Sequence, residues 1–225
     1  MAGVIADAGT LYGFLHGPQP LLLPGEPAFW AVVLWTAVGF VMGSLPVAVV
    51  LARLLVHRDP RMVGDHNPGS ANAWRVAGPV VGLLAVILDG MKGFVPVALA
   101  YWRWHVTGWA ILPIMVAPLL GHMFSPLLGG RGGKGIAVTF GVWMGLTVWR
   151  VPMLFGLILC LLVLVVRLED VWALMAAWFL VLVYLLWAYP SAPVLVAGIV
   201  NYSLLIMRHT GDLRRPFFKG PRRTR

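Results

Sequence analysis

The chain has few ionisable side chains and almost no cysteine. Only 11% of its 225 residues are charged, and 8 acidic residues face 17 Lys and Arg. The one cysteine, Cys160, excludes a disulfide within the chain, and its apolar surroundings predict a packing residue. No Lys or Arg lies near the start, which argues against a cleaved signal peptide. Neither metal-ligand spacing nor a Ser-His-Asp arrangement is visible, so we expect no metal and no cofactor.

Apolar residues dominate what is present. They make up 60% of the chain, more than a soluble domain of this size can bury, so the composition indicates a membrane protein that crosses the bilayer several times. The net charge of +9 is compatible with nucleic-acid binding. The cations, however, lie mostly in short segments between apolar runs, which favours a membrane protein and argues against nucleic acid as a partner.

Apolar segments predict an all-α fold with about seven transmembrane helices. Residues 1–28 are expected to form an interfacial segment, 29–215 the integral membrane domain and 216–225 a basic tail. The run 136–166 is the least certain part, because Arg150 and Pro152 interrupt it. It predicts either two short tilted helices or one kinked re-entrant pair. The seven segments are Phe29–Val56, Pro79–Trp102, Trp109–Leu128, Ile136–Val148, Val151–Val166, Val171–Ala188 and Ala192–Met207.

The distribution of Lys and Arg predicts the topology. With seven spans, one side collects the loop 57–78, the turn 167–170, a glycine-rich loop and the C-terminal tail, and nearly all loop cations fall there. Because cations accumulate on the cytoplasmic side, we expect the N-terminus outside and the C-terminus in the cytoplasm.

The glycine-rich loop at residues 129–135 is the most informative segment. Five glycines surround Arg131 and Lys134, and an apolar helical run follows from Ile136. Consecutive glycines let backbone N–H groups converge on an anion, and a helix N-terminus adds favourable dipole charge, so the loop predicts a phosphate site. The competing interpretation is a flexible turn between membrane helices whose cations only mark the cytoplasmic side. The spacing is not that of a Walker loop, because Gly135 follows Lys134.

Further candidates for chemistry lie on the same side. Asp89 and Lys92 are three residues apart within a span, which predicts an ion pair on one helix face, either structural or next to a site. His122 is interpreted as a packing histidine. His209 is a candidate general acid or base beside Arg208, with an interfacial anchor as the alternative.

Read together, these segments resemble the bacterial membrane acyl-phosphate:glycerol-3-phosphate acyltransferases, the PlsY family, from about Val41 to Arg215. The matching motifs occur in the same order. They are Gly43-Ser44-Leu45-Pro46, the loop from Gly64 to Arg75, Leu88-Asp89-Gly90-Met91-Lys92-Gly93, Gly121-His122-Met123-Phe124-Ser125 with Gly132-Gly133-Lys134-Gly135-Ile136-Ala137, and Arg208-His209 with Arg215.

The chain departs from the family pattern at several motif positions. Asp65 stands where the family has serine, His66 where it has glycine and Ala71 where it has threonine. Asp212 replaces an asparagine of the last motif, and Pro221 falls where an acidic residue is expected. A carboxylate at position 65 would repel phosphate unless Arg75 or Arg61 offset it. These departures keep open an alternative function, a divergent relative that binds or transports a phosphorylated lipid or anion.

The resemblance implies an enzyme of phospholipid biosynthesis in the bacterial cell (inner) membrane, with its active site facing the cytoplasm. Its substrates would be acyl phosphate and glycerol 3-phosphate, its product lysophosphatidate and its surroundings membrane lipid. Catalytic roles would fall to His209, Arg75 and Asp65. Phosphate binding would fall to Gly132, Gly133, Lys134, Gly135, Arg131, Asn72, Ser70 and Arg208. No feature of the sequence specifies an oligomeric state.

Overall fold

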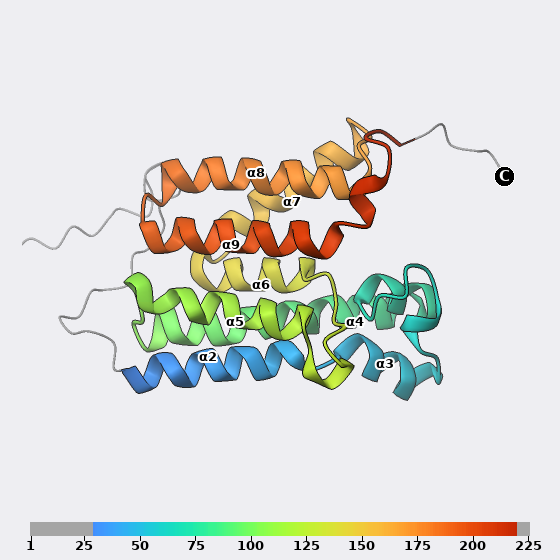
Figure 1. Cartoon of the computed structure of the whole chain (residues 1–225), viewed down its shortest axis with the longest axis horizontal. Coiled ribbons are helices and arrows are strands. Elements are labelled where there is room, and N and C mark those ends of the chain that lie inside the picture. Colours follow the sequence, from blue (N-terminus) through green and yellow to red (C-terminus); the bar gives the residue numbers. More distant parts are fainter. Residues whose placement is uncertain (1–28, 220–225) are drawn as a thin grey trace, which may run out of the picture.

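The computed structural model describes residues 29–219, which are helical apart from turns, short connections and one isolated β-bridge (Figure 1). The predicted all-α fold is therefore confirmed. A π-helical turn, Leu99–Arg103, extends α4. The α-helices are α2 (Phe29–Ser44), α3 (Val47–Val56), α4 (Ser70–Ala98), α5 (Ile111–Met123), α6 (Ile136–Thr147), α7 (Arg150–Leu164), α8 (Asp170–Ala188) and α9 (Ala192–His209).

Within residues 29–219, five helical segments are long and apolar enough to cross a membrane: Phe29–Val56, Ser70–Arg103, Gly108–Leu128, Asp170–Ala188 and Ala192–His209. The first is interrupted between α2 and α3 by Pro46, which has no backbone N–H to continue the helix. α6 and α7 have 12 and 15 residues, which is about 18–23 Å of helix, short of a hydrocarbon core of about 30 Å. Seven crossings and the direction of the N-terminus therefore stay predictions.

The run 136–166 forms two separate helices. Val148 lies between them with a φ of 58°, and this backbone reversal ends α6. Arg150 begins α7, and Pro152 lies in its first turn, where a missing N–H costs nothing. The interruption seen in the sequence is thus a tight turn between two short helices.

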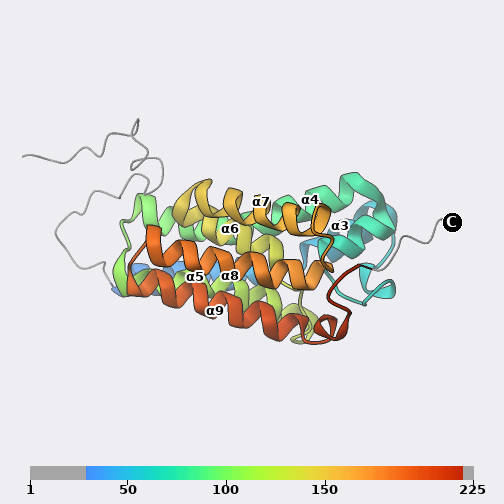
Figure 2. The same cartoon turned by 90° about the horizontal axis from the view of Figure 1, so that it is seen from above.

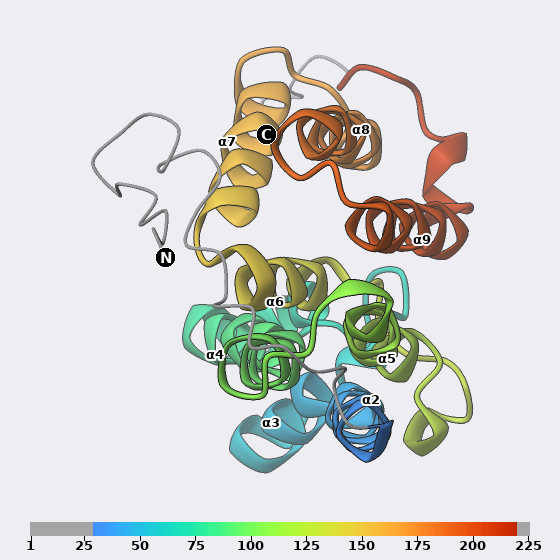
Figure 3. The same cartoon turned by 90° about the vertical axis from the view of Figure 1, so that its left-hand side faces the viewer.

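The helices form two groups that meet at α6. Seen from one end, α2 to α5 lie on one side of α6, and α7, α8 and α9 lie on the other (Figure 3). In the second group, α8 and α9 run side by side along their length (Figure 2). Glycines allow α4 and α6 to approach closely: a Cβ on Gly93 would lie 2.6 Å from the carbonyl oxygen of Val138. On the other side, Trp178 packs edge-on against Trp143 and Phe155, with ring centroids 5.6 and 4.9 Å away. This aromatic cluster joins α8 to α6 and α7.

A buried polar network fixes α9 against α6. The Asn201 side chain accepts a hydrogen bond from Trp143 Nε1 at 3.0 Å and donates one to Thr139 Oγ1 at 3.0 Å. All three side chains are at most 1% exposed, so each bond satisfies a group that would otherwise be buried without a partner. The middle of α9 is therefore held in a fixed position against α6.

The prediction that Cys160 packs inside the protein is wrong, because its side chain is exposed on α7.

The two predicted terminal segments are described only in part. The predicted interfacial segment 1–28 lies outside the described residues. Of the predicted tail, residues 216–219 run beside the start of α8, where the N–H of Glu169 donates to the carbonyl of Phe217 and that of Lys219 donates to Arg167, both at 3.0 Å.

Candidate functional site

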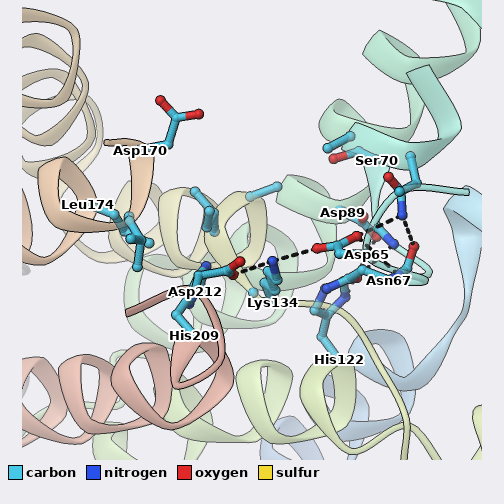
Figure 4. Close-up of a pocket in the computed structure, with 18 of the residues that line it drawn as sticks. Asp65, Asn67, Ser70, Asp89, His122, Lys134, Asp170, Leu174, His209 and Asp212 are labelled. Carbon is cyan, nitrogen blue, oxygen red and sulfur yellow. Dashed lines mark hydrogen bonds and ion pairs between the residues drawn. The ribbon is translucent and has the colours of Figure 1, made fainter. Parts of the chain in front are cut away.

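A cavity of about 700 Å³ opens at one end of the helices, where loop 57–69, the glycine-rich loop and the segment after α9 meet (Figure 4). Residues at the beginnings of α4, α6 and α8 line it. Because the N-terminus of a helix carries partial positive charge, three helix dipoles favour an anion there. Seven predicted site residues line this cavity: Asp65, Ser70, Asn72, Arg75, Lys134, Gly135 and His209.

Asn72 organises the first loop. Its side-chain Nδ2 lies within hydrogen-bonding distance of the carbonyls of Val63 and Asn67, each at 3.0 Å, and of Asp65 Oδ1 at 2.9 Å. Its Oδ1 accepts a bond of 2.8 Å from Arg75 Nη1. Asn72 was predicted to bind phosphate, and here both ends of its amide hold other site residues in place.

Gly64 and His66, next to Asp65 in this loop, both have left-handed backbone conformations. Gly64 has a φ of 61°, and a Cβ there would collide with Arg75 Nη1 and lie 2.7 Å from Asn72 Oδ1. His66, at a position where the PlsY pattern has glycine, has a φ of 59°. Its Nδ1 lies 2.9 Å from the carbonyl oxygen of Arg61, a local contact that helps to hold a conformation glycine adopts more readily.

Lys134 is the charged centre of the cavity. Its Nζ lies 2.6 Å from Asp65 Oδ2 and 2.5 Å from Asp212 Oδ2, so one ammonium joins two carboxylates from distant segments (Figure 4). Arg215 pairs with the other oxygen of Asp212 at 3.0 Å.

The expectation that Arg75 or Arg61 offsets Asp65 is therefore wrong. Arg75 donates to Asn72, and Arg61 pairs with Asp59 at 2.8 Å. Asp59 also pairs with Arg53, and the hydrogen bond from Arg61 holds the Asp59 pKa well below its usual range. Arg53, Asp59 and Arg61 stabilise the beginning of the loop and do not line the cavity.

The electrostatic environment keeps Asp65 ionised. Burial by itself would raise the pKa of this carboxyl, but the hydrogen bond and charge of Lys134 act against it, helped by Asn72 and the backbone N–H of Asn67. The net result is that the pKa of Asp65 falls to about 2. The cavity thus contains a carboxylate at neutral pH where the PlsY pattern has a hydroxyl.

The backbone of the glycine-rich loop is held by its neighbours. The N–H groups of Gly132 and Gly133 donate to the carbonyls of Met123 and His122 at 3.2 and 3.0 Å, so the expectation that these two N–H groups converge on a phosphate is wrong. Arg208 donates to the carbonyls of Gly132 and Gly133, at 2.5 and 3.2 Å. Neither these glycines nor Arg208 line the cavity.

The glycines are there because the loop lies against the end of α5. A Cβ on Gly132 would collide with the carbonyl oxygen of His122, and one on Gly133 would collide with the His122 imidazole. Because these glycines lack a side chain, the loop can approach the end of α5 closely, and this approach places Lys134 at the cavity. Arg131 is exposed and does not line the cavity.

The predicted helix N-terminus after the glycine-rich loop is confirmed. Gly135, with a φ of 83°, is the residue before α6, and Ile136 and Ala137 of its first turn line the cavity. The first N–H groups of a helix have no acceptor within the helix. The first turn of α6 therefore presents hydrogen-bond donors on the side of the cavity where Lys134 lies.

His122 and Asp89 are lining residues that were not among the predicted site residues. Lys92 pairs with Asp89 at 2.5 Å, as the three-residue spacing predicts, and both side chains are almost fully buried. The remaining bond of Lys92 goes to the carbonyl of Leu45 at the break between α2 and α3. His122 Nδ1 lies 3.8 Å from Asp89, so the histidine interpreted as a packing residue also borders the site.

His209 ends α9 with a buried imidazole that borders the cavity. Its Nδ1 lies 2.8 Å from the carbonyl oxygen of Leu205, which can only accept, so Nδ1 carries a hydrogen. In the neutral ring the second nitrogen, Nε2, is then an acceptor. This is the tautomer that a base needs.

The sequence model of the glycerol-3-phosphate acyltransferase family matches residues 33–219. The chain belongs to this family. Glycerol-3-phosphate acyltransferase 1 of Thermotoga maritima is 34% identical over 196 residues, which cover 80% of this chain and 95% of the relative. Comparison with solved structures shows that this chain and members of the family also share a fold.

Two crystal structures of PlsY (YgiH), an integral membrane glycerol 3-phosphate acyltransferase, resemble this one. The glycerol 3-phosphate form is 28% identical, with a TM-score of 0.76 over 84% of this chain and 96% of PlsY. The lysophosphatidic acid form is 27% identical, with a TM-score of 0.75 over 82% and 91%. The predicted family, membrane fold and activity are confirmed: the chain is a membrane acyltransferase that acts on glycerol 3-phosphate.

Proposed function

We propose that the acyl donor is acyl phosphate and that the product is lysophosphatidate, formed at the 1-hydroxyl of glycerol 3-phosphate. The observation that carries this proposal is the cavity itself, where the beginnings of three helices and the cations Arg75, Lys134 and Arg215 surround one space of about 700 Å³. Such an arrangement suits two phosphate groups. The apolar lining residues Ile136, Val171 and Leu174 would contact the alkyl chain of the donor.

The phosphate of glycerol 3-phosphate would bind at Lys134 and the first turn of α6, next to Gly135. Arg75 and Ser70, at the beginning of α4, would hold the phosphate of the donor. Asn72 keeps Arg75 in place through its bond of 2.8 Å. Gly132, Gly133 and Arg208 contribute indirectly, because they fix the loop that carries Lys134.

The transfer needs no nucleophile from the enzyme, because an acyl phosphate is a mixed anhydride with a good leaving group. The acceptor hydroxyl oxygen attacks the acyl carbonyl carbon, the bond from that carbon to the phosphate oxygen breaks, and inorganic phosphate leaves. The hydroxyl proton goes to His209 Nε2 or to the departing phosphate. Positioning and charge stabilisation by Arg75 and Lys134 then supply most of the rate enhancement.

The donor is tested with the purified protein in detergent. Palmitoyl phosphate and glycerol 3-phosphate are expected to give lysophosphatidate and inorganic phosphate in equal amounts, with the acyl group on the 1-hydroxyl. Palmitoyl coenzyme A is the control donor. Transfer from the thioester alone, with none from the acyl phosphate, would overturn the proposed donor and leave the acyltransferase family intact.

We also propose that the protein lies in the bacterial inner membrane with the cavity facing the cytoplasm. The support is the concentration of Lys and Arg in the loops on that side. In a background without Cys160, a cysteine introduced by Ser70→Cys is expected to react with an impermeant maleimide in inside-out vesicles and not in intact spheroplasts. The opposite pattern would reverse the topology.

A further inference from the structure

Lys134 is bound by two carboxylates that come from segments far apart in the sequence. Asp65 belongs to the first loop and Asp212 follows α9, yet both lie within 2.6 Å of the same ammonium nitrogen. Their side chains are 35% and 15% exposed, and that of Lys134 is 26% exposed, so water screens these contacts only in part. The cation best placed to bind a phosphate therefore already has two anionic partners.

The two carboxylates differ in what else holds them. Asp212 has a second cation, Arg215, at 3.0 Å. Asp65 has only neutral hydrogen-bond donors besides Lys134, namely the Asn72 side chain at 2.9 Å and the Asn67 N–H at 3.3 Å, within the described residues. If Lys134 turns to another anion, Asp212 keeps a charged partner and Asp65 does not.

We propose that Asp65 and Asp212 are specificity-determining residues that set the affinity of the site for phosphate. They act as internal anions, and a substrate phosphate must displace them from Lys134 before it can bind there. Asp65 resists displacement more than Asp212, because it loses its charged partner. This inference deepens the proposed function and rests on Lys134 as the glycerol-phosphate ligand.

The arrangement also gives the carboxylates a positioning role. With two acceptors on opposite sides, the flexible Lys134 side chain stays at the cavity before substrate arrives (Figure 4). The serine and asparagine that the PlsY pattern has at these positions cannot compete with phosphate for a cation in this way, because they are uncharged. We therefore expect the chain to need a higher concentration of phosphorylated acceptor than variants carrying neutral residues there.

The test measures binding of inorganic phosphate and the kinetics of the same variants. Asp65→Asn and Asp212→Asn keep the size of each side chain and remove its charge. Loss of an ion pair of this exposure corresponds to up to about 1 kcal/mol, so Asp65→Asn should tighten the dissociation constant of inorganic phosphate by about fivefold. Asp212→Asn should have the smaller effect. The KM for glycerol 3-phosphate should fall in the same order, with kcat changing less than KM.

Asp59→Asn is the matched control, because it removes a carboxylate from the same loop at a position that does not line the cavity. Its phosphate affinity should equal that of the parent. Unchanged or weaker phosphate binding in both Asp65→Asn and Asp212→Asn would overturn the inference, and so would an equal gain in Asp59→Asn, which would indicate net charge alone. If Asp65→Asn does not fold, Asp65→Ser takes its place.

The proposed acyl donor and the proposed role of Asp65 and Asp212 can fail separately. Tighter phosphate binding by the variants, together with a parent that transfers no acyl group from acyl phosphate, would support the inference and overturn the proposed donor. An active parent whose variants bind phosphate no better would leave the proposed donor standing and overturn the inference.

Discussion

Arg208 and Gly132 are joined by a hydrogen bond of 2.5 Å from the guanidinium Nη2 to the backbone carbonyl oxygen. A second bond from Arg208 Nε reaches the carbonyl of Gly133 at 3.2 Å. Through these two bonds the end of α9 fixes the loop that carries Lys134. An arginine expected to bind substrate therefore acts on the backbone of the loop, outside the cavity lining.

Arg208→Ala should loosen the glycine-rich loop and so displace Lys134. A hydrogen bond from a charged donor contributes about 1.5–3 kcal/mol, so loss of these bonds should lower kcat/KM for glycerol 3-phosphate by about tenfold or more. Arg208→Lys, which keeps the charge and cannot make both bonds, should fall in between. Initial rates at varied glycerol 3-phosphate check this, and parental kinetics in Arg208→Ala would contradict it.

Gly133→Ala should destabilise the protein because its Cβ would collide with the imidazole of His122. Overpacking of this kind costs about 1–3 kcal/mol. The same substitution in a His122→Ala background should cost much less, because the colliding ring is gone. Gly211→Ala is the control, since nothing lies within 4 Å of a Cβ there and its backbone is helical. Thermal unfolding in detergent compares the parent with Gly133→Ala, His122→Ala, the double variant and Gly211→Ala. Equal losses from Gly133→Ala in both backgrounds would rule out the collision as the cause.

Acid should destabilise the protein through Asp65. Its pKa in the folded protein, about 2, lies below the ordinary value of 3.8, so its stabilising contribution is fully present above about pH 5 and is lost as the pH falls toward 2. Asp65→Asn should therefore lower the unfolding midpoint at pH 6 and flatten its decline between pH 5 and 3. Midpoints recorded across this range check the sign, and an equally steep decline in Asp65→Asn would contradict it.

The sequence was sufficient to predict the helical membrane fold, because long apolar runs indicate a membrane environment directly. Much of the site was predicted only through the resemblance to the PlsY family, since a polar loop by itself does not distinguish a site from a connector. It also predicted the ion pair of Asp89 and Lys92, since three-residue spacing on a helix leaves little choice. It did not predict which cation meets Asp65, because Lys134 is 69 positions away and the contact depends on how α4, α6 and α9 pack.

The contacts of the glycine-rich loop also depend on packing that the sequence does not reveal. Its composition indicated a cradle of backbone N–H groups for an anion, and those of Gly132 and Gly133 instead bind the end of α5. A glycine needed for close helix contact and one needed for anion binding look alike in a sequence. Gly135 and Lys134 line the cavity, whereas Arg131 is exposed and does not line it. His122 was recognisable in a motif, although a lone histidine in an apolar helix usually indicates packing.

Binding of the glycerol 3-phosphate phosphate by Lys134 is tested most simply by a comparison of Lys134→Ala with Arg131→Ala. Both variants remove one cation from the same loop, but only Lys134 lines the cavity.

Initial rates are recorded at varied glycerol 3-phosphate and at varied acyl phosphate. We expect Lys134→Ala to raise the KM for glycerol 3-phosphate by about tenfold or more, consistent with about 1.5–3 kcal/mol for a charge-assisted bond. We expect a much smaller rise in the KM for acyl phosphate, and near-parental values for Arg131→Ala. Equal rises for both substrates, or equal effects of the two substitutions, would contradict this role of Lys134.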